Sequence, residues 1–503
     1  MTVESVILNT LAAAASRLAL LFRGSLTYRL TAAAMGKLKD FFDESVIWRA
    51  VKSNEKTSRL FEESLFFNML QWSADKLVSA ARKTLFLSYT AYKTSIAGML
   101  LDRLSENLAL LTGFFILVQS VTPYYLWHNH YTVFMVLAVA FLYLVRAAGD
   151  RRYGLDFRKI DFAMLLFAAS IVLAAVTSLM PAGSLRVLVF NIVLFLFVFI
   201  VVNLITKKEE LGILVYFITA SVAVTSLYGI WQYMNHIPVD PLLVDINFGG
   251  GVGRVFSTMG NPNDFATFLL LTIPFLGAAF FNAKNFAARA IILALAALAT
   301  ANLALTYTRA AWIGFAAAAF IYVLLKDRRL LPLFLLLGAA FVPFMPKSVA
   351  TRLASMGRDT SSRYRINIWL GSLRMLKDYW ISGIGLGPEP FRKLFGAYTS
   401  VQLPVHSHML YLEIWLEAGI AAIASFIWFM AGIIKKGFLH VFKSGDEYLK
   451  NIIIAGMASL TGLLVAGLTD YVWFYPRAMN MFWIVAAVVL AALNLAGRRE
   501  GCV

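Results

Sequence analysis

The chain has 503 residues, of which 60% are hydrophobic and only 15% are charged, and its formal net charge is +17. A soluble protein of this length would carry about 25% charged residues, so the composition indicates a polytopic membrane protein. A single cysteine, Cys502, excludes an internal disulfide and a cysteine-based metal cluster. Basic loops between apolar spans explain the positive charge better than nucleic-acid binding does, so no nucleic-acid partner is expected.

Residues 1–103 mix apolar and charged side chains at helical spacing, without an uncharged run of the roughly 18–20 residues that a membrane span needs. Arg17 interrupts the first apolar stretch and no basic segment precedes it, so the pattern is not that of a signal peptide. We expect amphipathic helices that lie on the cytoplasmic surface of the membrane, or a small helical domain docked onto the membrane part.

Residues 104–500 alternate long apolar runs with loops, which predicts an all-α transmembrane domain of about 12 helices by the roughly 20-residue length of a span. We expect membrane lipids to surround such a domain. A long polar segment at 347–408 separates the ninth span from the tenth. The expected spans lie at 107–124, 131–146, 161–180, 185–205, 210–234, 263–283, 286–307, 310–325, 329–346, 409–434, 451–470 and 473–497.

Lysine and arginine are concentrated in one alternating set of loops, which the positive-inside rule assigns to the cytoplasm together with both termini. The alternation of spans then makes 347–408 an external loop, although it is basic, because long loops escape the rule. The unusual polar side chains fall on the external side. The basic loops are 146–159, 206–210, 326–329, 434–450 and 497–500.

Several arginines lie at these external span ends. Arg309, in TYTRAAW, would either face a polar cavity or extend to lipid headgroups. A positive segment contains Arg363, Arg365 and Arg374, and Trp369 follows Arg365 by one turn on the same helix face. Guanidinium groups suit a diphosphate, and a headgroup-binding amphipathic helix is the alternative. Helix capping by the turn NPND does not explain Arg254, which precedes it.

The stretch HSHMLYLE places His406 and His408 directly before the tenth span. A histidine is a natural general base near neutral pH. The pair could instead cap the span, or share a metal with the histidines at 128–130, although no metal site is expected. If the helix already runs through His406, this residue shares a face with Glu413 and Glu417, and His406 or Glu413 would be the base.

Five elements occur in an order that resembles the bacterial O-antigen ligase and O-antigen polymerase superfamily. The resemblance covers roughly residues 250–430 by motif, and Met409 stands where the family usually has asparagine. The glycine-rich element is expected to be a tight turn, since it lacks the Lys-Ser/Thr of a phosphate-binding loop. The matching elements are Gly260–Asn263, Thr308–Trp312, Arg365–Trp369, Gly383–Phe391 and His408–Gly419.

The resemblance implies transfer of a glycan from a polyprenyl-diphosphate donor to an acceptor hydroxyl on the external face of the bacterial cytoplasmic membrane, without metal or cofactor. Arg309 and Arg365 would hold the diphosphate, and His408 would be the base. Acceptors would be a glycan, a lipid or a wall anchor, and O-linked protein glycosylation is an alternative. A transporter or flippase of lipid-linked glycans is another, but no repeated broken spans are evident. The expected substrate-binding residues are Arg254, Arg363, His406, Trp369, Glu413 and Glu417.

Overall fold

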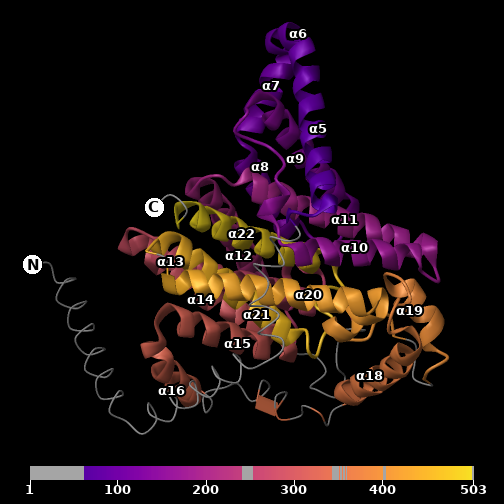
Figure 1. Cartoon of the computed structure of the whole chain (residues 1–503). Coiled ribbons are helices and arrows are strands. Elements are labelled where there is room, and N and C mark those ends of the chain that lie inside the picture. The colour runs from indigo at the N-terminus through magenta and orange to yellow at the C-terminus, as the bar shows by residue number, and fades with distance from the viewer. Residues whose placement is uncertain are drawn as a thin grey trace, which may run out of the picture.

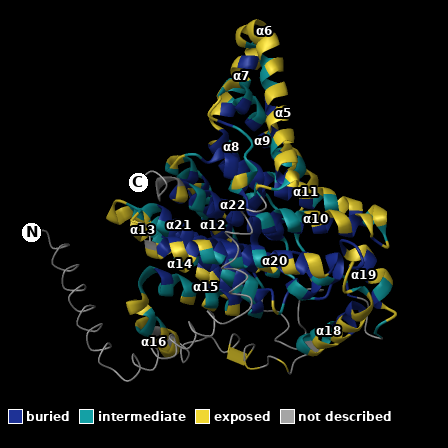
Figure 2. Cartoon of the chain, viewed as in Figure 1, coloured by how far each residue is buried: buried dark blue, intermediate teal, exposed yellow. Residues whose placement is uncertain are grey.

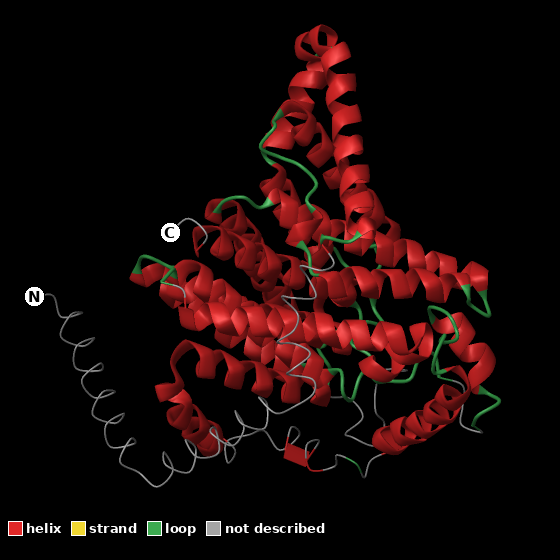
Figure 3. Ribbon diagram, in the orientation of Figure 1, coloured by secondary structure: helices red, strands yellow, loops and turns green. Residues whose placement is uncertain are grey.

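Within the residues that the computed structural model describes, every regular element is a helix (Figure 3). The predicted all-α class is therefore confirmed for this part of the chain. The first 61 residues of the predicted N-terminal region, and parts of the predicted long loop, lie outside it. The described residues are 62–240, 253–341, 350, 351, 354, 357, 360–399, 404–443 and 445–500.

The long apolar helices pack side by side into one bundle (Figure 1). They are apolar enough for lipid surroundings, and their backbone polar groups are paired within each helix. Their bounds are α8 (Leu108–Val121), α9 (Asn129–Gly149), α10 (Phe162–Val176), α11 (Pro181–Leu204), α12 (Lys208–Met234), α13 (Pro262–Asn282), α14 (Phe286–Leu305), α15 (Arg309–Asp327), α16 (Leu331–Phe341), α20 (Leu410–Lys443), α21 (Glu447–Ala466) and α22 (Pro476–Glu500).

Nine spans in the described part of the chain are long and apolar enough to cross a membrane, or ten if one bent pair counts as a span. They support a multi-pass membrane protein, but the predicted count of about twelve is not confirmed. The bent pair is α7 (Ile96–Glu106) with α8, which meet at 76°. Helix α10 has only 15 residues, short of the roughly 20 that a span needs. The expected eighth and ninth spans fall in one run, Arg309–Ala340.

Helices α21 and α22 form the centre of the bundle, where most of their side chains are buried (Figure 2). Helices that are apolar on all sides are buried in this way, because they have no polar face to turn outward. Aromatic rings fill the space around them. The ring of Trp473 lies 5.1 Å from that of Phe426 and 5.9 Å from that of Trp483.

Helices α15 and α21 lie antiparallel at very close range. A Cβ atom on Gly314 would come within 2.5 Å of the Gly462 carbonyl oxygen and 3.1 Å of the Ala466 side chain. Small residues allow such a close approach between apolar helices. At the other end of the pair, Lys326 Nζ donates to Asn451 Oδ1 at 2.7 Å. The contact therefore aligns the start of α15 with the end of α21.

The basic loops come together at one end of the bundle. Ion pairs join loops that are far apart in sequence, because cations that lie close together need nearby carboxylates. We call the opposite end, where α13, α15 and α20 begin and α21 stops, the histidine end. The pairs at the basic end are Arg146–Glu210, Lys208–Asp446, Lys326–Glu447 and Lys436–Asp161.

Two smaller parts lie outside the bundle. Helices α5 (Leu65–Leu87), α6 (Tyr89–Thr94) and α7 extend away from it at the top of Figure 1. Arg82 of α5 donates to backbone carbonyls at 147 and 153, so this part docks at the basic end. Helices α18 (Thr360–Tyr379) and α19 (Pro388–Phe395) share a separate small apolar core with the first turns of α20.

Candidate active site

The two histidines lie in a loop that leads into α20. Because the helix begins at Leu410, it does not run through His406, so this residue shares no helical face with Glu413. His408 has a φ of 54°, a left-handed conformation that residues other than glycine rarely adopt. The Leu410 N–H donates to the Gly467 carbonyl at 2.9 Å and ties the loop to the segment that follows α21.

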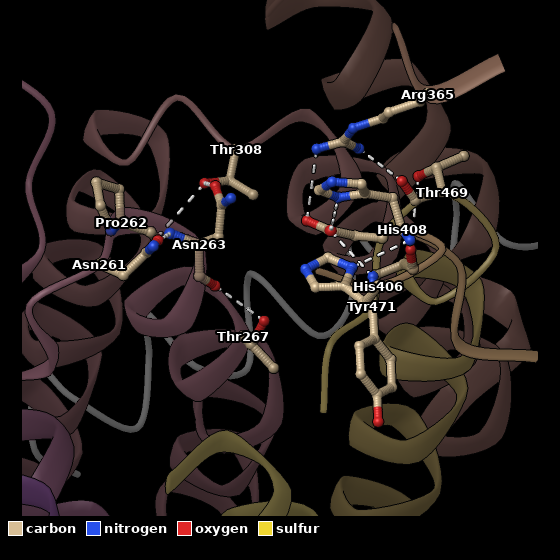
Figure 4. A network of polar contacts seen from close by, with 12 residues as sticks. Asn261, Pro262, Asn263, Thr267, Thr308, Arg365, His406, His408, Thr469 and Tyr471 are labelled. Atoms are coloured by element: carbon tan, nitrogen blue, oxygen red, sulfur yellow. Dashed lines mark hydrogen bonds and ion pairs between the residues drawn. The ribbon is translucent and has the colours of Figure 1, made fainter. Parts of the chain in front are cut away.

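Asp470 joins His408 and Arg365 into one cluster (Figure 4 shows His408 and Arg365). Its Oδ1 lies 3.8 Å from His408 Nδ1, and its Oδ2 lies 3.8 Å from Arg365 Nη2. Arg365 Nη1 also donates to the Thr469 carbonyl at 2.6 Å. Burial would raise the pKa of the Asp470 carboxyl, but Arg365 and then His408 hold it well below its usual range. Asp470 is therefore an ionised carboxylate between two basic side chains.

The position of Asp470 determines which nitrogen of His408 can act as a base. Nδ1 is buried and has no hydrogen-bond partner among the described residues, and its 3.8 Å distance to the carboxylate is an electrostatic contact. A negative charge there favours the tautomer that carries its proton on Nδ1. Nε2 then keeps its lone pair. Since the side chain is 24% exposed, that nitrogen can accept a proton from a hydroxyl group.

His406 has a different environment. Its Nδ1 accepts the backbone N–H of His408 at 3.1 Å, and its ring lies 4.5 Å from that of Phe474. Burial, and then the neighbouring His408, lowers its pKa to about 3. A neutral ring whose Nδ1 accepts a hydrogen bond carries its proton on Nε2. His406 can therefore donate a hydrogen bond but is a poor general base, which separates the roles of the two histidines.

Arg254 holds together the points where α13 and α15 begin (Figure 4 shows Asn263 and Thr308). Its Nη2 donates to Asn263 Oδ1 at 2.8 Å and to Thr308 Oγ1 at 3.2 Å. Its Nε donates to the Thr306 carbonyl at 2.8 Å. Arg309 is the first residue of α15, directly after this contact. The structure therefore brings Arg254 and the start of Arg309's helix together.

Arg309 lies at the same end of the bundle as Asp470. Gly314 contacts Ala466 across the antiparallel pair α15–α21. Arg309 precedes Gly314 by little more than one helical turn, and Asp470 follows Ala466 by about the same length of chain. Both residues therefore extend beyond the contact in the same direction. Arginines from two separate sequence motifs thus reach the end that carries His408.

The three predicted site residues of α18 have different surroundings. Arg365 reaches the Asp470 cluster, whereas Arg363 is exposed. Trp369 packs against the small core that α18 and α19 form, and its Nε1 has no hydrogen-bond partner within the described part of the chain. The structure therefore brings Arg365 to the histidines and places Trp369 one turn away, against apolar side chains.

Glu413 and Glu417 each bind a backbone amide. Glu413 Oε2 accepts the Ser407 N–H at 2.6 Å, and Glu417 Oε1 accepts the Gly387 N–H at 2.8 Å. Both carboxyl groups are buried on α20, one helical turn apart. One therefore fixes the histidine loop and the other fixes the glycine-rich turn. A position against the backbone suits residues that shape the site, and both also line a cavity.

The glycine-rich turn at 383–387, which leads into α19, docks onto a break in α20. Gly419 interrupts the helix with a φ of 74°, and a Cβ there would lie 1.9 Å from the Ile381 carbonyl oxygen. Gly383 has a φ of 71°, and its Cβ would lie 2.5 Å from the Glu417 carbonyl oxygen. Only glycine fits both the left-handed backbone and the close approach. The element is thus a packing turn, as its sequence predicts.

A cavity of about 790 Å³ lies beside the histidine loop. Its volume and its mainly apolar walls are typical of small-molecule sites, which carry a few polar groups for orientation. His406 belongs to this cavity, on the far side of the loop from the Arg365 cluster. The polar side chains in its wall are His128, Asn129, His130, Arg186, Asn191, His406, Glu413, Glu417 and Tyr471.

Asp470 is the residue that sequence reasoning missed. It stands in the pattern LTDY at the end of a predicted span, where the motif elements offer no match. One feature of the sequence could have identified it: Asp470 is the only acidic residue in the segment between α21 and α22, at the predicted external end. Tyr364 was missed too, and its ring lies 6.3 Å from that of His408.

Among the described residues, no three or more His, Cys, Asp or Glu side chains lie in an arrangement that could hold a metal ion. The rings of His128 and His130 stack on each other at 5.3 Å. The site that the structure offers is therefore built from guanidinium, imidazole and carboxylate groups.

No curated protein is significantly similar to the chain. Residues 294–427 match the family model described as O-antigen ligase. The matched segment includes Arg309, Arg365, Asp378 and both histidines, whereas Asp470 lies beyond it. Over this segment the chain is therefore similar to the O-antigen ligase family, in agreement with the resemblance to the O-antigen ligase and O-antigen polymerase superfamily.

Proposed function

We propose that this protein transfers a glycan from a polyprenyl-diphosphate donor to an acceptor hydroxyl at the external face of the bacterial cytoplasmic membrane. The family match supports glycan transfer of the O-antigen ligase type. Apolar spans support a membrane location. The observation that carries the mechanism is the contact of Asp470 with both His408 and Arg365, because it joins a base to a cation.

In the proposed reaction, His408 removes the proton from the acceptor hydroxyl. The acceptor oxygen then bonds to the anomeric carbon of the donor glycan, and the bond between that carbon and the diphosphate oxygen breaks. The proton goes to Nε2 of His408, and solvent takes it up afterwards. Asp470, 3.8 Å from Nδ1, stabilises the imidazolium that forms.

The leaving group is the polyprenyl diphosphate, which gains negative charge as the bond breaks. Arg365 and Arg309 would bind it, since guanidinium groups pair with phosphate oxygens in a bidentate way. Fixed cations that face a developing charge are a large source of rate enhancement. Arg365 is held by the Thr469 carbonyl and by Asp470, so it would be oriented before the donor arrives.

The site lies at the end of the bundle opposite the basic loops. By the positive-inside rule the basic end is cytoplasmic, which would put the site on the external side. There it would meet a lipid-linked glycan after export. The acceptor would be a surface glycan, a lipid or a wall anchor, which corresponds to a polymerase or a ligase of a surface polysaccharide.

The test uses the purified full-length protein in lipid nanodiscs with a lipid-linked oligosaccharide and a lipid or glycan acceptor. Wild-type protein should form a new glycosidic bond, detected by mass spectrometry. His408→Ala should lower kcat by roughly 100-fold to 10,000-fold, the range for loss of a general base, while donor affinity stays unchanged. The matched control is His236→Ala, an exposed histidine at the end of α12.

Three outcomes would contradict the proposal. Full transfer by His408→Ala would remove this residue from the base role. Loss of wild-type transfer in a chelator would contradict metal independence. Movement of the donor across proteoliposome membranes, without any new glycosidic bond, would favour a transporter instead.

A further inference from the structure

A second cavity, of about 670 Å³, lies at the histidine end beside the first turn of α13. The volume falls within the roughly 300–1,000 Å³ of small-molecule sites. Its wall combines aromatic rings with polar side chains, unlike the more apolar cavity beside His406. The wall includes Tyr124, Trp127, Tyr475, Asn261, Asp264 and Arg477.

Two buried polar atoms in this wall have no partner within the described part of the chain. They are the carboxylate oxygen Oδ1 of Asp264, which is 3% exposed, and the indole Nε1 of Trp127, which is 9% exposed. One is an acceptor and the other is a donor. Buried polar atoms are almost always paired, so both suggest a group that enters the cavity and can donate and accept.

The charge in this wall disfavours a phosphate. Arg477 is already engaged, because its Nη1 donates to the Thr258 carbonyl at 3.0 Å and its Nη2 donates to the Thr122 carbonyl at 2.7 Å. Its guanidinium also lies over the ring of Trp127, 5.1 Å from the centroid. Asp240 lines the cavity together with Asp264, so carboxylates outnumber cations there. The wall therefore offers an anionic ligand little electrostatic attraction.

We propose that this cavity binds a sugar ring of the glycan substrate. A pyranose has hydroxyl groups that both donate and accept, which suits Asp264 and the Trp127 indole. It also has apolar C–H faces, which pack on aromatic rings such as the half-exposed Tyr124. The inference rests on the proposed glycan transfer and assigns to it a sugar subsite.

The element Gly260–Asn263 builds one side of this cavity. Gly260 has a φ of 81°, and a Cβ on it would lie 2.5 Å from Cγ of Tyr124. Glycine is therefore required where this aromatic ring packs. Asn261 caps α13 by accepting the Asn263 N–H at 2.8 Å, and its amide donates to the Tyr475 hydroxyl at 2.5 Å. Gly260–Asn263 therefore forms part of the cavity wall in addition to capping α13.

The cavity adjoins the proposed reaction centre. Tyr475 lies on the segment between α21 and α22 that also carries Asp470. Asn129 and Pro476 line both this cavity and the one beside His406. On its other side, Asn263 contacts Arg254. A sugar held here would therefore be close to the groups assigned to the diphosphate and the base.

Binding is tested with the full-length protein in nanodiscs and a panel of methyl glycosides of glucose, galactose, mannose and N-acetylglucosamine. Saturation-transfer NMR should detect at least one of them on wild-type protein. Asp264→Asn and Tyr124→Ala should weaken it by roughly tenfold to 100-fold, the loss expected for a hydrogen bond to a charged group or a stacked ring. Tyr233→Ala, an exposed aromatic at the same end outside the cavity, is the control.

Kinetics then distinguish the two possible sources of the sugar. If the ring belongs to the donor, Tyr124→Ala raises KM for the lipid-linked oligosaccharide at least tenfold. If it belongs to the acceptor, the same change appears in the acceptor KM instead. Since Tyr124 is half-exposed, its replacement should leave folding intact, which thermal unfolding checks in parallel.

The inference and the proposed function fail separately. Glycoside binding by a protein that forms no glycosidic bond would keep the sugar subsite and refute the transfer reaction. Active transfer, with both KM values unchanged within about twofold in Tyr124→Ala and Asp264→Asn, would overturn the subsite. Absence of saturation transfer from every glycoside in the panel would overturn it too. His408→Ala should retain glycoside binding.

Discussion

Replacement of Asp470 by asparagine removes one charge while it keeps the size of the side chain. At 3.8 Å from His408 Nδ1, the carboxylate would stabilise an imidazolium by about 4 kcal/mol at an effective dielectric constant of ~20. The His408 side chain is 24% exposed, and solvent weakens the interaction. We therefore expect a loss of roughly 2–3 kcal/mol of transition-state stabilisation, which lowers kcat by about 30-fold to 150-fold.

The effect should appear in kcat and not in the donor KM. Arg365 keeps its 2.6 Å hydrogen bond to the Thr469 carbonyl in this variant and loses an anion that competes with the diphosphate. Donor binding should thus be equal or slightly tighter. The assay measures initial rates of glycan transfer in nanodiscs over a range of donor concentrations, which separates the two constants.

A matched substitution controls for a general effect of lost charge. Asp378→Asn, in α18, removes a carboxylate that accepts the hydroxyl of Tyr398 at 2.6 Å, outside the cluster. It should retain the wild-type kcat. A kcat for Asp470→Asn within about threefold of the wild type would refute the idea that this carboxylate acts through His408, since its Coulomb interaction would then contribute almost nothing.

Two further predictions concern stability, measured by thermal unfolding in detergent. Because burial, and then His408, lowers the pKa of His406 to about 3, protonation favours the unfolded chain. The contribution of neutral His406 to the free energy of unfolding is fully present above pH ~6.5. It is lost on acidification towards pH 3, by about 1.4 kcal/mol per pH unit. His406→Gln should flatten this dependence between pH 6.5 and 4.5, and an unchanged slope would contradict the pKa. Gly419→Ala should destabilise by at least ~2 kcal/mol, since φ is 74° and the new Cβ would lie 1.9 Å from a carbonyl oxygen. Gly154→Ala, with open space around the Cβ, is its control, and equal unfolding temperatures for the two variants would refute the packing argument.

The helical class and the separation of the two ends follow from the order of residues alone. Runs of about 20 apolar residues have few stable forms in a membrane other than helices, because every backbone polar group must be paired within the lipid. Basic loops at every second connection already divide the chain into two faces. Arg254, Arg309, Arg365 and His408 then fall at one end, and in the structure their contacts also lie where α15 begins and α21 stops.

Tertiary contacts decided how these residues act. His406 and His408 are two positions apart, yet one is buried against Phe474 and the other faces Asp470. That difference arises because α20 begins only at Leu410 and because the segment after α21 folds back against the loop. Local sequence cannot show which distant segment supplies a carboxylate.

Tertiary contacts also decided the roles of the acidic residues of the site. Glu413 and Glu417 read from sequence as candidates for substrate contact, and the structure shows each accepting a backbone N–H. Asp470 and Asp264 carry no strong sequence signal, but one faces two basic side chains and the other lines a cavity with an unpaired oxygen. The sequence by itself determined the helical class of the chain and the alternation of apolar segments with basic loops. Only packing decided which charges meet, because electrostatic contacts act over a few ångströms and depend on segments far apart in the chain.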